Sequence, residues 1–224
     1  MTHAHEYHNL ILSHLEKVKR TRPTPEFKAL QAWQANRLLN THMALYEQPR
    51  FRPAMDFFKD ELYSAEHFHR RNDQLIRALP LMCRTMPASV LDVVVSAAEL
   101  HGLSLELDAL LLHYLGNEPN LNELSLKSWV AAYRACQNPV DRARQLDLIE
   151  LLGTELKTIV RKPMIRSLLS WATVPARLAG YDDIHQFVCR GYDAFDQLDN
   201  PDDFLIPVLT VERQLSDEWF SAST

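Results

Sequence analysis

The sequence predicts an all-α protein, a compact bundle of about ten helices, several of them broken by proline, in one domain over residues 1–224. Three observations support this prediction. Apolar residues recur at intervals of three or four from Tyr7 to Trp219, as they do on one face of an α-helix. Glycine is scarce, with 5 in the chain, and 46% of the residues are hydrophobic, which is enough for a substantial core. Alternating apolar and polar runs flanked by turn residues, the pattern of strands, are missing from the sequence.

The first two helices are predicted over residues 7–22 and 25–45. Pro23 and Pro25 cannot continue the first helix. Thr24 is a good N-cap and proline suits the first helical position, so the second helix begins immediately afterwards.

The middle of the chain is interrupted by residues that end or bend helices. Pro80 and Pro87 should bend or break one helix, and Gly102 should close another. The segment 104–115 is apolar on nearly all sides, which indicates a helix through the middle of the fold. Three helices are therefore predicted, over residues 65–79, 88–101 and 104–115.

Helical periodicity is clearest in the second half of the chain. Gly153 lies beside the apolar stripe of the longest helix and favours close approach of a neighbour. Pro175 should interrupt a helix, and Pro207 should kink the last one. Five helices are predicted here, over residues 126–138, 140–161, 165–172, 184–198 and 202–219.

Composition and charge exclude several classes of function. The net charge is −5 and the pI about 6.0, whereas a general nucleic-acid binder carries a basic excess. No stretch reaches the ~18 uninterrupted apolar residues of a membrane span, and the N-terminus has no signal core. The three cysteines, Cys83, Cys136 and Cys189, form no CxxC pair. We therefore expect a cytoplasmic protein that binds neither nucleic acid nor membranes.

Residues 57–63, FFKDELY, resemble the signature of a bacterial family named for its FFLEELY motif. Lys59 and Asp60 stand where that family has Leu and Glu. The segments 68–75 and 175–195 are also similar, so the resemblance covers most of the chain. It implies a bacterial helical protein of unknown function, and it supplies no reaction and no catalytic residues.

The motif has a structural interpretation of its own. Phe58 and Leu62 share one helical face and should be buried in the core. Asn72, where the family usually carries Asp, falls in the apolar stripe of the next helix. A buried amide needs hydrogen-bond partners, from the protein or from a ligand.

A tentative ligand site follows from these positions. Tyr63, Arg71 and Asn72 come from the motif region, and Arg177 and Tyr181 surround a proline-broken helix. If the two segments meet across a cleft, the arginines are available to an anionic group. In the alternative interpretation, both arginines lie on the surface and pair with nearby acids.

Metal and cofactor sites are not predicted. The 10 histidines include Glu66 and His69 at the Glu-x-x-His spacing, but a di-iron bundle requires a second such pair. Sequence motifs for nucleotide binding or for an activated serine nucleophile are also missing.

The leading hypothesis is a non-catalytic binding or interaction module. Its expected partner is a small molecule or a protein. A second copy of the chain, in a homo-oligomer, is one such protein partner. The alternative is an enzyme that uses a small molecule or cofactor in a heme-oxygenase-like or ferritin-like bundle. That alternative rests on length and helix count alone. An exposed apolar patch would favour the interaction module, whereas polar side chains converging inside the bundle would favour the enzyme.

Overall fold

The computed structural model describes residues 2–20, 24–62, 65–116 and 121–221 of the chain. Within these residues the chain forms α-helices and short helical turns without a β-strand, so the predicted all-α class is confirmed. The helices are α1 (Thr2–Arg20), α2 (Pro25–Thr41), α3 (Met43–Tyr46), α4 (Arg52–Phe57), α5 (Ala65–Thr85), α6 (Ala88–Leu115), α7 (Leu126–Ala135), α8 (Pro139–Val160), α9 (Pro163–Leu178), α10 (Asp182–Asp196) and α11 (Asp202–Ser221). A π-helical turn, η1 (Phe58–Leu62), follows α4, and a 3₁₀ turn, η2 (Leu121–Glu123), precedes α7.

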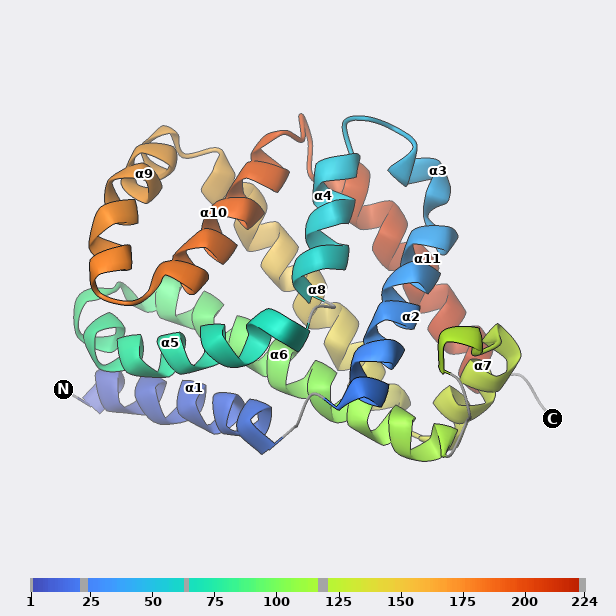
Figure 1. Cartoon of the computed structure of the whole chain (residues 1–224). Helices are drawn as coiled ribbons and strands as arrows, with labels where there is room; N and C mark the ends of the chain where they lie inside the picture. The colour runs from blue at the N-terminus through green and yellow to red at the C-terminus, as the bar shows by residue number, and fades with distance from the viewer. Residues whose placement is uncertain (1, 21–23, 63–64, 117–120, 222–224) are drawn as a thin grey trace.

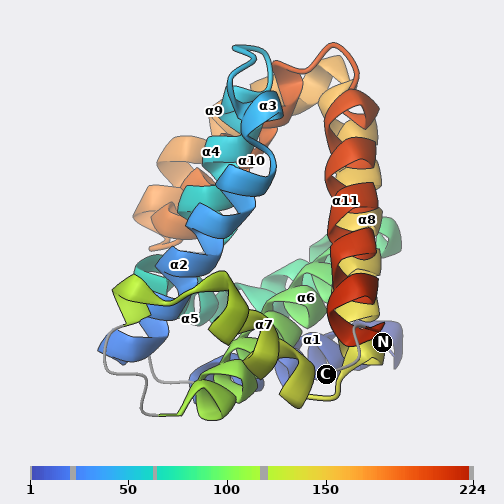
Figure 2. The same ribbon diagram turned by 90° about the vertical axis from the view of Figure 1, so that its right-hand side faces the viewer.

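The helices are arranged around α6 and α8. Helix α6 packs against α1, α2, α7 and α8, and α1 packs against α5. Helices α8 and α11 run antiparallel side by side (Figure 2). Helices α9 and α10 form a hairpin at one end of the molecule, next to α5 (Figure 1).

Helix α6 is continuous, so the predicted break at Gly102 is wrong. Glycine usually disfavours a helix interior by about 1 kcal/mol relative to alanine. Here a Cβ at Gly102 would lie 2.9 Å from the carbonyl oxygen of His14 on α1. The glycine therefore permits close packing of α1 on α6 and does not end the helix.

By length and composition, α6 is the one helix in the described chain that could cross a membrane. Core helices of soluble proteins meet the same criterion of length and apolar composition as membrane-spanning helices do. In this structure α6 contacts helices from both halves of the chain.

Prolines mark many of the boundaries, as expected. The side chain of Thr24 accepts a hydrogen bond from the backbone N–H of Phe27 at 3.2 Å, with proline at the first helical position of α2. Pro207 lies inside the last helix, as predicted. The predicted interruption at Pro175 is wrong, because α9 continues to Leu178, and α5 likewise continues past Pro80 to Thr85. All three prolines are exposed, so water can bond the carbonyl group that each proline leaves without a helical donor.

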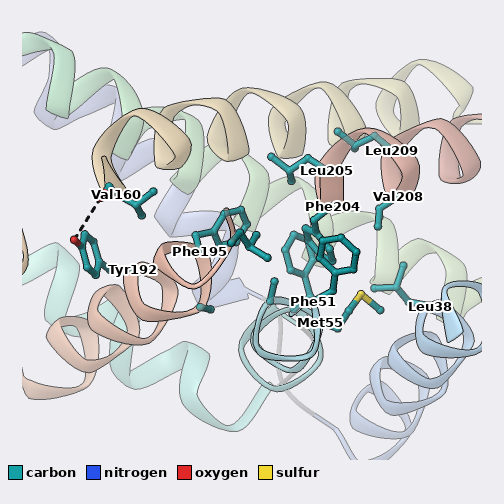
Figure 3. Close-up of a cluster of buried hydrophobic side chains, with 14 residues drawn as sticks. Leu38, Phe51, Met55, Val160, Tyr192, Phe195, Phe204, Leu205, Val208 and Leu209 are labelled. Carbon is teal, nitrogen blue, oxygen red and sulfur yellow. Dashed lines mark hydrogen bonds between the residues drawn. The ribbon is translucent and has the colours of Figure 1, made fainter. Parts of the chain in front are cut away.

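One cluster of buried apolar side chains joins α2, α4, α8, α10 and α11 (Figure 3). Phe58 of the motif belongs to it, with its ring centre 5.6 Å from that of Phe204 and 6.4 Å from that of Phe195. The predicted burial of Phe58 is confirmed. The side chain of Leu62 lies outside the described part of the structure.

Candidate functional site

Residues 57–62 of the FFKDELY motif form the end of α4 and the π-helical turn η1. A π-helical turn has i→i+5 hydrogen bonds, and such turns often occur at functional sites. Phe58 enters the core, while Phe57 packs on the ring of Phe187 with centroids 5.5 Å apart. Glu61, from the same turn, is also buried. The motif therefore directs both aromatic and acidic side chains inward.

Glu61 is bound by two arginines from different helices. Arg71 of α5 donates from Nη1 to the carboxylate at 2.6 Å and from Nη2 to the Glu61 backbone carbonyl at 3.0 Å. Arg190 of α10 places Nε 2.6 Å from the other carboxylate oxygen. We call Glu61, Arg71 and Arg190 the Glu61 clamp. The clamp joins the motif, α5 and α10 through one carboxylate.

Arg71 is the buried cation of the clamp. Its guanidinium lies 4.4 Å from the centre of the Phe187 ring. Burial lowers the pKa of Arg71, and the neighbouring carboxylate of Glu61 partly offsets this effect. Arginine remains protonated despite such a shift, so Glu61 and Arg71 form a buried ion pair.

A second set of bonds ties α5 to the turn between α9 and α10. Gln74 donates to Asp183 at 2.6 Å and accepts from the backbone N–H of Ile184 at 3.0 Å. Arg77 donates to the carbonyl of Gly180 at 3.1 Å. The two segments that resemble the FFLEELY family are therefore packed against each other. The ligand cleft expected between them stays a prediction.

The predicted site residues have different environments within this contact. Arg71 and Asn72 are buried on α5, but the Arg71 guanidinium is engaged by Glu61. Arg177 is exposed and lies 3.8 Å from Asp182, while Tyr181 is half-buried at the start of α10. Tyr63 lies outside the described residues. A ligand-binding role for these residues stays a prediction.

The space beside Gly191 on α10 is filled by the motif itself. A Cβ at Gly191 would lie 3.0 Å from Cζ of Phe57. Glycine at this position allows the motif to pack directly on α10. The close approach also places Arg190 at the carboxylate of Glu61.

Asn72 has an unusual environment for an amide. Its side chain is 3% exposed, and neither Oδ1 nor Nδ2 has a hydrogen-bond partner among the residues that the structure describes. The predicted burial is therefore confirmed, and the predicted partners are not present among the protein groups. An unbonded buried amide is destabilising, by about 1–3 kcal/mol.

A buried polar network that the sequence analysis missed lies between α2, α6 and α11. Gln34 and Gln31 donate to the two carboxylate oxygens of Asp108 at 2.9 and 3.3 Å. Burial raises the pKa of Asp108, although both glutamines and Arg142 act to lower it. The signal available in the sequence was the pair of glutamines at i and i+3 among the apolar positions of α2.

A second part of this network links α2 to α11. Arg37 Nη1 lies 2.7 Å from both carboxylate oxygens of Glu212, and His42 Nε2 lies 2.9 Å from one of them. Burial would raise the pKa of Glu212, but the hydrogen bond from His42 and the charge of Arg37 outweigh burial and lower it. Polar side chains therefore do converge inside the bundle, and most of them bind one another.

A different feature appears on the outer face of α9, where six apolar side chains are exposed. Five of them range from 48% exposed for Leu168 to 83% for Leu178, with Trp171 at 75%, and the sixth, Pro175, is also exposed. We call Met164, Leu168, Trp171, Val174, Pro175 and Leu178 the α9 stripe. The sequence analysis predicted this helix but did not identify the stripe. The available signal was that α9 is apolar on two faces, of which one can pack on α10.

The inner face of α9 is attached to α10 and to the core. Ile165 and Leu169 pack against the large apolar cluster. His185 Nε2 lies 2.9 Å from the carbonyl of Leu169, and Arg166 pairs with Asp193 and Asp196. The hairpin is thus held from inside, and the stripe is presented outward.

No group of three or more His, Cys, Asp or Glu residues able to bind a metal is found in the part of the chain that the structure describes. The side chains of Glu66 and His69 lie outside that part. The three cysteines are free thiols, two of them buried.

The fold and the candidate site define an all-helical protein in which a clamped hairpin presents an apolar helix face. The chain belongs to a family described as a domain of unknown function, DUF8198, whose model matches residues 14–224. A search of curated proteins and a search of solved structures returned no match.

Proposed function

We propose that this chain is a non-catalytic interaction module that binds an apolar helix of another polypeptide along the α9 stripe. The exposed stripe is the observation that carries the proposal. Soluble proteins seldom leave a contiguous row of large apolar side chains in water, and such rows mark contact sites. Trp171, at the middle of the row, belongs to the residue type most enriched among binding hot spots.

The spacing of the stripe favours a helical occupant. Positions 164, 168, 171, 175 and 178 are separated by four, three, four and three residues. This is the a/d spacing of helices that pack side by side with interdigitated side chains. A flat or extended partner has no need of such a repeat.

The Glu61 clamp supports the stripe by fixing the hairpin that carries it. Glu61 binds α10 through Arg190, and α10 holds α9 through His185 and Arg166. The docking surface is therefore preorganised, which reduces the entropy lost on binding. In this proposal the FFKDELY motif has a supporting role and does not contact the partner.

Free cysteines and the FFLEELY resemblance support a finer statement of context. Cys83 and Cys136 are buried thiols and Cys189 is half-buried. Thiols persist in a reducing compartment. We place the module in the bacterial cytoplasm.

Photocrosslinking tests the proposal. A photoreactive phenylalanine analogue replaces Trp171 in the full chain, and the same analogue replaces the exposed Val140 on α8 as a matched control. Illumination in cells producing the protein should give a defined polypeptide adduct at position 171 but not at position 140. Mass spectrometry should map the adduct to an amphipathic helix, and a second substitution, Leu168→Glu, should abolish it. Crosslinks to lipid alone, or no adduct specific to position 171, would overturn the proposal.

A further inference from the structure

Most of the α9 stripe is symmetric about Trp171. Met164 and Leu178 each lie seven residues from it, which is about two helical turns. Leu168 and Val174 each lie three residues from it, one on either side, whereas Pro175 is matched by Ser167. An antiparallel second copy would therefore set Met164 beside Leu178 of that copy and Trp171 near its own counterpart. Such a pairing is self-complementary, as a two-fold interface requires.

The residues beside the stripe do not oppose this pairing. Ser167, Ala172 and Ala179 flank it and are small and uncharged. Arg166 and Arg177 lie on α9 itself, and each pairs with aspartates at or near α10 of its own chain. Because these charges are already compensated, the helix neither repels a second copy nor requires an acidic partner.

The two ends of α9 also favour an antiparallel copy. Arg161 and Lys162 are exposed immediately before the helix, which contains no Asp or Glu. An antiparallel arrangement brings these cations to the C-terminal end of the second α9. Helix C-terminal carbonyl groups carry partial negative charge and attract cations. A parallel arrangement would instead bring the basic ends together.

From this symmetry we infer that the helix bound by the α9 stripe is α9 of a second copy of this chain, packed antiparallel with a two-fold axis beside Trp171. The inference rests on the proposed function and names its partner. An anionic membrane is the less favoured occupant. The net charge of the chain is −5, which repels an anionic lipid surface.

The size of the contact predicts a weak dimer. Helix α9 has 16 residues and is therefore about 24 Å long. A pair of such helices buries on the order of 500 Å² per copy, less than the roughly 800 Å² of a standard stable interface. We expect dissociation in the micromolar range, so both species are present at ordinary working concentrations.

Sedimentation equilibrium of the full chain from about 1 to 200 μM tests the dimer. Trp171→Glu should shift the dissociation constant upward at least tenfold, whereas Val140→Glu, at the far end of α8, should leave it unchanged. Circular dichroism of both variants checks that they are folded.

Disulfide trapping tests the orientation. In a Cys189→Ser background, Met164→Cys and Leu178→Cys chains are prepared separately and mixed under a mild oxidant. The antiparallel pairing predicts a covalent dimer in the mixture and little in either variant alone. Crosslinking of each variant with itself would indicate a parallel pair and would overturn the inferred geometry.

The outcomes separate this inference from the proposed function. A chain that is monomeric to 200 μM and forms no mixed disulfide overturns the second copy as partner. If the crosslink at position 171 then maps to a helix of a different polypeptide, the interaction module stands without self-association. If photocrosslinking also gives no polypeptide adduct, the proposed function fails too. Binding of the wild-type chain to phosphatidylglycerol vesicles, lost in Trp171→Glu, would overturn both in favour of a membrane contact.

Discussion

Individual buried polar side chains in this molecule differ sharply in how their hydrogen-bonding capacity is used. The carboxylate of Glu61 binds two arginines at 2.6 Å each. Asn72, one residue beyond Arg71 on α5, forms no hydrogen bond through either amide atom within the described part of the chain. Buried polar groups are almost always paired, so Asn72 is an exception that predicts a measurable cost.

Replacing Asn72 by leucine should therefore stabilise the protein. Leucine is of similar size and removes the two unbonded polar atoms, so we expect the free energy of unfolding to rise by about 1–3 kcal/mol. Urea titration followed by circular dichroism measures the change. If Asn72→Leu instead lowers stability, the amide is hydrogen-bonded in solution, to water or to a ligand. That result would support the ligand site predicted from the sequence.

Asp108 gives a prediction that depends on pH. Because burial raises its pKa, the folded state binds the proton more tightly than the unfolded state. The resulting stability is fully present below the ordinary value of 3.8 and is lost as the pH rises through the folded pKa. Asp108→Asn keeps the side chain neutral, and Gln31 Oε1, which has no partner, can accept its N–H.

Asp108→Asn should therefore be more stable than the wild-type chain at pH 7, with the difference disappearing as the pH falls below 3.8. Each unit of pKa shift is worth about 1.4 kcal/mol. Urea titrations of both proteins at several pH values measure the difference. Equal stability at pH 7 would show that Asp108 is not destabilised by ionisation.

At the level of helices and turns, the motif acts as a connection. The π-helical turn directs Glu61 inward, α5 supplies Arg71, and α10 supplies Arg190. Phe57 packs against Gly191 at the same junction. Each of the three elements depends on the other two for its position, so the hairpin of α9 and α10 should loosen when the clamp is broken.

The two halves of the clamp should differ in strength. Glu61→Ala leaves the Arg71 cation buried without its carboxylate and should lower the free energy of unfolding by about 3–5 kcal/mol. Arg190→Ala removes a half-exposed partner and should cost about 1 kcal/mol or less. Amide hydrogen exchange should accelerate across α9 and α10 in Glu61→Ala, and much less in Arg190→Ala. Uniformly unchanged exchange in both variants would show that the clamp does not position the hairpin.

The helices themselves could be predicted from local patterns, because capping and apolar spacing are local properties. Thr24 and Pro25 start α2 as expected, and Phe58 is buried as its spacing indicated. Gly102 could not be interpreted correctly, because its role depends on the distance to His14 on α1. Whether a glycine ends a helix or allows a neighbouring helix to pack closely depends on tertiary contacts.

The candidate site was less predictable for the same reason. The sequence identified the two segments that meet, and it identified Asn72 as buried. It did not show that Arg71 is engaged by Glu61, since their pairing depends on the π-helical turn. Nor did it reveal the α9 stripe, because apolar residues give the same helical spacing in the sequence whether their side chains face the core or the solvent.

For the whole molecule, the central position of α6 links elements from both halves of the chain. It contacts α1 and α2 from the first half and α7 and α8 from the second. A disruption in one half is therefore transmitted to the other through a shared helix. These contacts favour the prediction that the chain forms a single domain.

We accordingly expect one cooperative unfolding transition. Circular dichroism, which follows all helices, and fluorescence of the Trp33, Trp129 and Trp219 cluster should give the same urea midpoint in a Trp171→Phe background. Two separate midpoints would indicate that the α9–α10 end unfolds independently and would contradict the single domain.

The distribution of the four tryptophans has a spectroscopic consequence. Trp33, Trp129 and Trp219 pack in one aromatic cluster, in which Trp33 stacks on Trp129 at 5.4 Å and Trp219 meets Trp129 edge to face at 5.0 Å. Trp171 stands away from them, 75% exposed on α9. Its emission should be red-shifted and open to collisional quenchers such as iodide, while the clustered indoles are shielded. The unlabelled chain therefore carries an optical sensor at the middle of the stripe, and loss of iodide quenching would record the moment at which that surface is covered.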